Sequence, residues 1–214
     1  DIKKVMYLYK DNFLTESTFK MFNEEMLNSY KPRPEGWWTK HGQLGYESYG
    51  KGLSGENFNE DAPELVLGEN YPEENNYVRS AMLMGSKSLP DVVRSIKKHM
   101  IEDLKFTNPL ARMMWFQYHS NKHKVISHFD DPLTGKTRQQ SFTSLLYMHD
   151  TWEDTWGGEL TFYNHNDPVS ILPKSNRLVI YSRDEEHWVN EITHDLDDYH
   201  RMFLFTAWGT DNDI

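Results

Sequence analysis

Residues 142–189 decide the fold class and read FTSLLYMHDTWEDTWGGELTFYNHNDPVSILPKSNRLVIYSRDEEHWV. Short runs rich in leucine, β-branched and aromatic residues alternate here with turn signals such as Gly157-Gly158 and Asp167-Pro168. This pattern predicts short β-strands. The same alternation of apolar runs and turn signals continues before and after this stretch. We therefore predict strands at residues 111–119, 124–128, 140–149, 158–164, 168–172, 176–182, 186–192 and 200–208. Eight short strands in about a hundred residues are typical of a closed or double-sheet β architecture, such as a jelly roll.

The part of the chain before this β region carries helix signals. A strand is predicted from Val5 to Tyr9, and an N-cap signal at Thr15-Glu16-Ser17-Thr18 precedes apolar residues at helical spacing. A second helix is predicted to start at Asp91, directly after Pro90. We therefore predict a supporting region with a long loop over residues 1–110 and a β core over residues 111–214, in one compact domain.

The connection between the two helices, residues 31–76, is rich in glycine, asparagine, glutamate and aromatic residues. Connections of this length without regular structure are uncommon in compact domains and are often lids or binding loops. Trp37-Trp38 would then be part of a cover over the substrate. The alternative interpretation is that these aromatic residues only fix the loop to the core.

Composition excludes several classes of function. The chain has 214 residues, no cysteine and a formal net charge of −10, so cysteine-ligated zinc, iron–sulfur clusters and thiol catalysis are excluded. The acidic balance disfavours nucleic acid as a partner. No apolar run approaches the roughly 18 residues of a membrane helix, and no signal-peptide pattern or Asn-x-Ser/Thr sequon is found. These features favour a soluble, cytoplasmic protein.

Two His-x-Asp sequences are candidate metal sites. His165-Asn166-Asp167 lies beside Pro168, where turn chemistry explains the polar residues. His128-Phe129-Asp130 ends a predicted strand, where side chains two residues apart point the same way. A third ligand is needed, and His187 begins a later strand of the same region. Two histidines and one carboxylate are the facial triad of non-haem Fe(II) oxygenases, which leaves coordination positions open.

Arg201 lies on the last predicted strand, 14 residues after His187. A buried guanidinium there needs an anionic partner. A dicarboxylate cosubstrate would supply one through two parallel hydrogen bonds. The alternative interpretation is a salt bridge to a nearby acid, such as Asp195 or Asp198.

Other polar residues have simpler interpretations. His149 ends a predicted strand and is expected to be exposed, and Arg177 and Arg183 are expected to form structural ion pairs. His119 and His123 flank a hairpin bend, where a contact with substrate is one interpretation.

Five motifs in residues 110–208 together resemble the 2-oxoglutarate- and Fe(II)-dependent dioxygenases, in particular their prolyl-hydroxylase-like branch. They are Gln117-Tyr118 ten residues before His128, Ser144 to His149 as the "LYYLN" strand, Gly157 to Leu160 as the "GGxL" hairpin, Pro173 to Tyr181 as "PxxxRLxxF", and His187-Trp188-Val189 as "HxV". Residues before 110 carry no motif of the family. The resemblance implies a double-stranded β-helix, the jelly-roll or cupin-like core, with supporting helices.

The resemblance also implies site residues. Three positions match the iron ligands, namely His128, Asp130 and His187. Three positions match residues of the cosubstrate pocket, namely Arg201 for the far carboxylate of 2-oxoglutarate, with Tyr147 and Tyr118. No catalytic residue is implied beyond the metal centre.

One departure from the family pattern concerns the last strand. Relatives usually carry an aromatic residue six positions after the arginine, whereas Trp208 lies seven after Arg201 and so on the opposite face. Either a bulge restores the alternation, or Phe203 and Phe205 line the pocket instead.

The sequence therefore predicts a hydroxylase that uses Fe(II), 2-oxoglutarate and O2, with ascorbate as an optional reductant. The bound iron would supply the oxidative chemistry, and the protein would supply geometry and a dry pocket. Acidic residues such as Glu153 and Asp154 favour a neutral or basic substrate. By family likeness the first candidate substrate is a prolyl peptide, followed by a free amino acid or a small metabolite. The alternatives are a cupin-like metal- or sugar-binding module, a non-oxidative cupin-type enzyme such as an epimerase, and a non-catalytic scaffold.

Overall fold

Two antiparallel sheets form the body of the described protein. The computed structural model describes residues 7–29, 77–80, 87–119, 124–130, 142–163, 167–194 and 201–209. The larger sheet has the order β1-β8-β5-β10-β3-β2 and the smaller sheet the order β4-β9-β6-β7. The strands are β1 (Tyr7–Lys10), β2 (Tyr77–Ser80), β3 (Leu110–His119), β4 (Val125–His128), β5 (Phe142–Tyr147), β6 (Leu160–Phe162), β7 (Val169–Ile171), β8 (Leu178–Ser182), β9 (His187–Val189) and β10 (Arg201–Gly209); the helices are α1 (Glu16–Ser29) and α3 (Leu89–Glu102).

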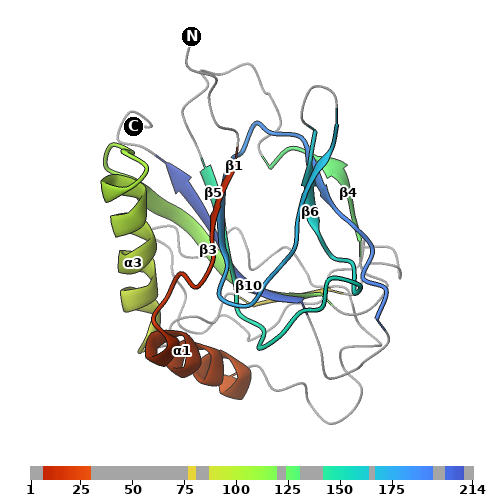
Figure 1. The fold of residues 1–214 in the computed structure, drawn as a ribbon. Coiled ribbons are helices and arrows are strands. Elements are labelled where there is room, and N and C mark those ends of the chain that lie inside the picture. The colour runs from red at the N-terminus through yellow and green to blue at the C-terminus, as the bar shows by residue number, and fades with distance from the viewer. Residues whose placement is uncertain are drawn as a thin grey trace.

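From β3 to β10 the chain passes repeatedly between the sheets. Strands β3, β5, β8 and β10 lie in the larger sheet, and β4, β6, β7 and β9 lie in the smaller one. The two sheets face each other, with α1 and α3 on the outer side of the larger sheet (Figure 1). This winding is that of a double-stranded β-helix, so the predicted jelly-roll, cupin-like core is confirmed.

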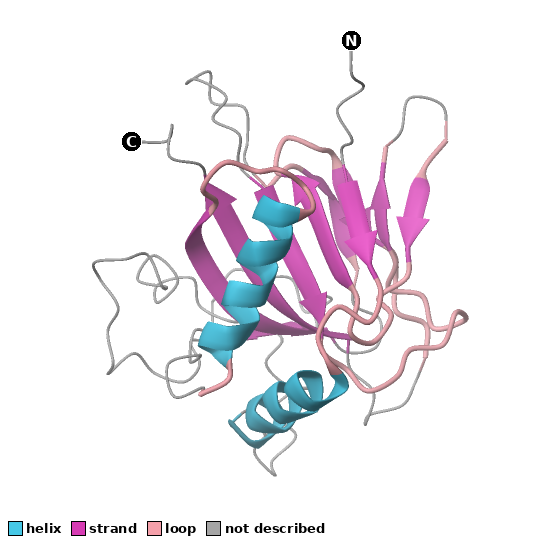
Figure 2. Ribbon diagram, turned by 60° about the vertical axis from the view of Figure 1, so that its left-hand side comes forward, coloured by secondary structure: helices cyan, strands magenta, loops and turns pink. Residues whose placement is uncertain are grey.

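Alternation along β10 separates two hydrophobic cores. Leu204 and Trp208 pack in the core that includes Ile96 of α3, and Figure 2 shows a helix lying across this face of the sheet. Phe203 and Phe205 belong to the core between the two sheets. Successive side chains of a strand point to opposite faces, so the interior face of β10 is the face that can contribute to a site between the sheets.

The eight strands predicted after residue 110 are present, most with ends one to a few residues shorter than predicted. Helix α1 begins after Thr15, whose side-chain oxygen accepts a hydrogen bond from the N–H of Thr18 (3.3 Å), as the N-cap signal predicted. Helix α3 begins at Leu89 rather than Asp91, because proline fits the first helical turn. Strand β2 was not predicted, and residues 31–76 with Trp37-Trp38 lie outside the described residues. No helix among the described residues is long and apolar enough to span a membrane.

Gly157 and Gly158 form the turn before β6, with φ angles of 73° and 74°. A Cβ at Gly157 would lie 2.0 Å from the backbone oxygen of Glu191, whereas one at Gly158 would meet only side chains, at 3.0 Å or more. We expect Gly157→Ala to lower the free energy of unfolding by about 1–3 kcal/mol, through backbone strain and overlap. Gly158→Ala should cost less, because side chains can shift. Urea unfolding of both variants checks the order, and an equal or reversed order would contradict it.

Candidate metal centre and anion pocket

A bulge in β4 places His128 on the interior face. Val125 pairs with Val189 and His128 pairs with His187, so two residues of β4 oppose the single residue Trp188 of β9. Val125 therefore packs inward with the core between the sheets, Ile126 points outward with 79% of its surface exposed, and His128 again faces inward. The bulge thus sets the two histidines directly opposite each other, with ring centroids 4.4 Å apart.

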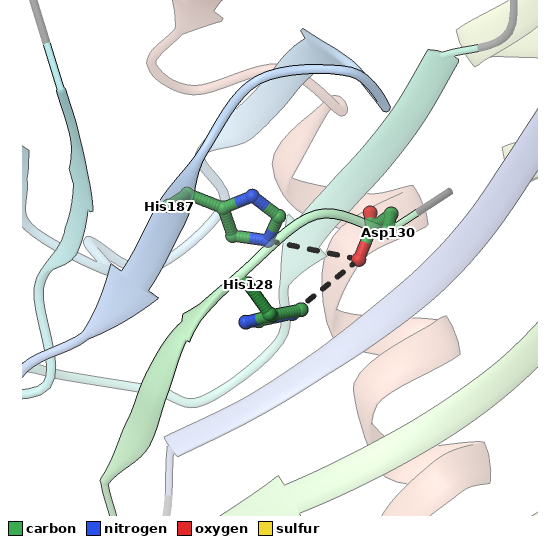
Figure 3. A group of neighbouring side chains, drawn as sticks. All are labelled: His128, Asp130 and His187. Carbon is green, nitrogen blue, oxygen red and sulfur yellow. Dashed lines mark ion pairs between the residues drawn. The ribbon is translucent and has the colours of Figure 1, made fainter. Parts of the chain in front are cut away.

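Three potential ligand atoms converge at this point (Figure 3). The Oδ1 atom of Asp130 lies 3.6 Å from Nε2 of His128 and 3.6 Å from Nε2 of His187. One ligand atom from each of the three residues lies within 4.8 Å of the others. Two imidazoles and one carboxylate are a donor set that suits a divalent iron or a similar transition metal.

Backbone carbonyls fix which ring nitrogen faces the cluster. Nδ1 of His128 lies 2.9 Å from the carbonyl oxygen of Ile126, and Nδ1 of His187 lies 2.8 Å from that of Glu185. Since a carbonyl oxygen only accepts, each Nδ1 carries the proton and donates it. Each Nε2 therefore presents a lone pair toward the cluster, which is the arrangement that metal-binding histidines require.

Hydroxyl groups hold the carboxylate of Asp130 in place. Thr143 and Tyr181 donate hydrogen bonds to Oδ2, at 2.6 and 2.9 Å, and Arg183 donates to the backbone oxygen at 2.8 Å. Oδ1 is thereby left to face the histidines. Burial on its own would raise the pKa of Asp130, but His128, His187 and Thr143 outweigh it and hold this pKa well below its ordinary value.

Burial lowers the pKa of the His187 imidazole, whereas burial raises that of a carboxyl group. The charge of Asp130 opposes this lowering. A neutral imidazole beside an ionised carboxylate is the protonation state that a metal requires. The residues present therefore fit a divalent cation. Of the second candidate pair, His165 and Asp167, the histidine lies outside the described residues.

Arg201, the residue that the resemblance implies for the far carboxylate of 2-oxoglutarate, is completely buried. It donates hydrogen bonds from Nε to the oxygen of Gly158 (2.8 Å) and from Nη2 to the hydroxyl of Tyr147 (2.9 Å), and Nη1 lies 3.2 Å from Nδ1 of His119. No described carboxylate forms an ion pair with it; Asp195 and Asp198 lie outside the described residues. Burial lowers the pKa of its guanidinium, which reflects the cost of a buried cation.

Tyr147 lies beside Arg201 on the interior face of β5. The guanidinium carbon of Arg201 lies 5.0 Å from the centre of its ring. Burial raises the pKa of the tyrosine hydroxyl, so this group stays protonated and can donate to an anion. The structure thus brings Tyr147 and Arg201 together. The side chain of Tyr118 is not among the side chains that the structure describes, so its predicted role stays a prediction.

The side chains of β10 show on which face of the sheet Trp208 lies relative to Arg201. Trp208 lies on the helix side, where its Nε1 donates a hydrogen bond to Ser144 (2.8 Å). The register with β3 does shift between Ala207 and Trp208, but the alternation of β10 itself is unbroken. Phe203 and Phe205 therefore share the interior face of β10 with Arg201, and their place in the pocket stays a prediction.

His149 was predicted to be exposed, and this prediction was wrong. Its ring is buried, with Nε2 donating to the backbone oxygen of Pro173 and Nδ1 accepting from the N–H of Met202 (3.1 Å). Burial is the largest cause that lowers the pKa of His149 from its ordinary value of 6.5 to about 3. A position at the end of a strand indicated exposure, but it did not reveal that two backbone groups converge there.

This shift has a consequence for stability at acid pH. The ring stays neutral in the folded protein but takes up a proton on unfolding below pH 6.5, so acid favours the unfolded state until the pH nears about 3. At about 1.4 kcal/mol per pH unit, the wild type should lose about 2 kcal/mol more than His149→Asn between pH 7 and pH 5. Urea unfolding at both pH values measures this difference. Equal losses in both proteins would show that His149 does not cause the effect.

A family model matches the β core of the chain. The family model of the 2OG-Fe(II) oxygenase superfamily matches residues 113–208, which include all three clustered ligand candidates and Arg201. These residues belong to that superfamily. Enzymes of this family use Fe(II), 2-oxoglutarate and O2, so the predicted enzyme class and these cofactors are confirmed. A search of curated proteins found no match.

Solved structures of 2OG-Fe(II) oxygenases share this fold. A prolyl hydroxylase from Trichoplax adhaerens, in complex with a hypoxia inducible factor peptide fragment, superposes with a TM-score of 0.61 and 20% identity, covering 98% of this chain and 85% of its own. A viral collagen prolyl hydroxylase from Paramecium Bursaria Chlorella virus-1 superposes with a TM-score of 0.60 and 10% identity, covering 96% and 97%. The alpha ketoglutarate dependent epimerase SnoN superposes with 0.59 and 13%, covering 96% and 78%. Two of these three are prolyl hydroxylases, the branch that the motifs resemble.

Proposed function

We propose that this 2OG-Fe(II) oxygenase hydroxylates prolyl residues of a peptide or protein. In this proposal His128, Asp130 and His187 hold the iron, and Arg201 with Tyr147 holds the far carboxylate of 2-oxoglutarate. Bound iron supplies the oxidation of an unactivated C–H bond with 2-oxoglutarate and O2. The residues of this chain orient the ligands, bind the cosubstrate and exclude water.

The observation that carries the proposal is the environment of Arg201. Its guanidinium has five N–H donors, of which three have partners in Gly158, Tyr147 and His119. Two donors remain without a partner among the described residues, and a carboxylate can accept both. A completely buried cation without a described counter-ion is costly unless an anion binds there. A metal- or sugar-binding module would not need such a cation.

The prolyl substrate is supported by likeness of two kinds. The motifs of residues 110–208 resemble the prolyl-hydroxylase-like branch, and two of the three structural neighbours described above are prolyl hydroxylases. One of them is a complex with a peptide fragment and the other is a collagen prolyl hydroxylase. Both names support a proline within a polypeptide as the substrate group.

The test is oxidation of proline-containing peptides by the full chain with Fe(II), 2-oxoglutarate and ascorbate. We use a collagen-like peptide and a hypoxia inducible factor peptide, each paired with a control in which alanine replaces proline. The expected result is succinate formation that depends on proline and a mass gain of one oxygen atom on the peptide. Succinate without oxidised proline would overturn the prolyl substrate. An altered stereocentre without a mass gain would indicate an epimerase instead.

A further inference from the structure

His119 lies beside Arg201 and is not part of the five motifs named above. It ends β3, and the strand register sets it directly opposite Arg201 of β10. Only 1% of its surface is exposed. Neighbours across an antiparallel pair lie close enough for their side chains to interact. The pairing of β3 with β10 therefore determines that this ring meets the guanidinium.

The contact fixes the tautomer of His119. Nη1 of Arg201 lies 3.2 Å from Nδ1, and because a guanidinium only donates, Nδ1 accepts. The neutral ring then carries its proton on Nε2, which lies 2.5 Å from Nε2 of the buried Gln117. Two donors cannot bond to each other, so we assign this amide in the reversed orientation, with its oxygen accepting from the ring. Phe203 meets the ring edge-on, with centroids 5.1 Å apart, so the plane of the imidazole is held as well.

These contacts hold every nitrogen of Arg201 in a set position. Gly158 accepts from Nε, Tyr147 from Nη2 and His119 from Nη1. Recognition of a carboxylate by two parallel hydrogen bonds depends on the orientation of the guanidinium plane. A neutral imidazole supplies the third support without cancelling the positive charge. An aspartate in the same place would form an ion pair with Arg201 and compete with an incoming carboxylate.

We propose that His119 is a positioning residue for the cosubstrate: its neutral ring orients Arg201 and leaves the remaining N–H groups and the full charge for the far carboxylate of 2-oxoglutarate. This inference rests on the proposed binding of 2-oxoglutarate at Arg201. It makes a specific demand on position 119, which must offer a hydrogen-bond acceptor at the site of Nδ1 and must carry no negative charge.

Asparagine and aspartate meet these two demands differently, although they have the same shape. His119→Asn keeps a neutral acceptor close to the site of Nδ1, His119→Asp adds a negative charge to that acceptor, and His119→Leu removes the acceptor. The affinity of each full-length variant for 2-oxoglutarate is measured by calorimetry in the presence of Mn(II). Oxalate is titrated in parallel, because it can chelate the metal but has no second carboxylate that reaches Arg201.

We expect His119→Asn to bind 2-oxoglutarate within a few fold of the wild type. His119→Leu should bind about tenfold more weakly, since a hydrogen bond to a charged group is lost, and His119→Asp more weakly still. Oxalate affinity should stay unchanged throughout. In the absence of 2-oxoglutarate, the aspartate of His119→Asp should form an ion pair with Arg201. The melting temperature of this variant should then be equal to or above that of His119→Asn.

Three other results would contradict either the role of His119 or the proposed cosubstrate site. If the asparagine and aspartate variants bind 2-oxoglutarate equally, His119 does not act through Arg201, and the proposed function stands. If oxalate affinity falls in parallel with that for 2-oxoglutarate, the role is structural and the inference is wrong. If the wild type with Mn(II) binds oxalate but not 2-oxoglutarate, the proposed cosubstrate site fails and this inference fails with it. The asparagine and aspartate pair decides the matter even if His119→Leu does not fold.

Discussion

Asp130→Ala is expected to remove Mn(II) binding and to reduce succinate formation to background. Oδ1 of Asp130 is the atom that faces Nε2 of both His128 and His187, at 3.6 Å from each. Without it only two neutral nitrogens remain, and no negative charge is left to offset that of the cation. We expect a loss of metal affinity greater than the roughly 10–100-fold that follows loss of a residue supporting a ligand. Calorimetry with Mn(II) measures it.

A graded series separates a metal role of Asp130 from a role in folding. Tyr181→Phe removes one hydrogen bond to Oδ2 but leaves Oδ1 in place, so metal affinity should fall by about 10–100-fold at most. Asp154→Ala removes an exposed carboxylate between β5 and β6 and should bind Mn(II) as the wild type does. Binding of Mn(II) by Asp130→Ala with wild-type affinity would exclude this carboxylate as a ligand.

The positions of most strands along the chain were predictable, because each of these strands carries its own local sequence signal. Residues 176–182, for example, combine a turn before the strand with a run of leucine, valine, isoleucine and tyrosine, and β8 is found at Leu178–Ser182. Strand β2 could not be recognised, since its four residues carry no alternation and its partner β3 lies over thirty residues away. Local patterns do not report pairing at that distance.

The spacing of His128 and Asp130 predicted that their side chains point the same way. The structure shows which contacts hold them in that orientation. The β4 bulge that turns His128 inward opposite His187 involves Ile126 and Ser127, which carry no bulge signal. Thr143 and Tyr181 reach Asp130 from two other strands, so only the folded sheet reveals them. The sequence suggested which residues have suitable chemistry, whereas long-range register decides which of them meet.

His119 illustrates the same limit. The sequence placed it at a bend, where a contact with substrate was one interpretation. The register of β3 with β10 sets it opposite Arg201 instead, and the contact between them spans 82 residues of the chain. A buried polar residue beside a buried cation can be recognised only when both strands are in place.

Arg201→Met is expected to abolish binding of 2-oxoglutarate while leaving the ligand-free protein at least as stable. Truncating one partner of a buried, hydrogen-bonded charge pair costs roughly 2–5 kcal/mol, which is about thirtyfold or more in affinity. The free wild type buries this guanidinium without a described counter-ion, at a desolvation cost on the order of several kcal/mol. Relief of this cost should offset the hydrogen bonds that Gly158, Tyr147 and His119 lose in the variant. Methionine adapts well to an irregular cavity.

Thermal unfolding distinguishes these opposite effects in one experiment. In the wild type, Mn(II) and 2-oxoglutarate together should raise the melting temperature more than either ligand alone, because the chelate and the far carboxylate bind cooperatively. In Arg201→Met the starting temperature should be equal or higher, and 2-oxoglutarate should add nothing to the effect of Mn(II). A retained shift would mean that another cation binds the carboxylate. A large fall in the starting temperature would instead make Arg201 a structural residue, whose hydrogen bonds to Gly158 and Tyr147 hold the sheets together.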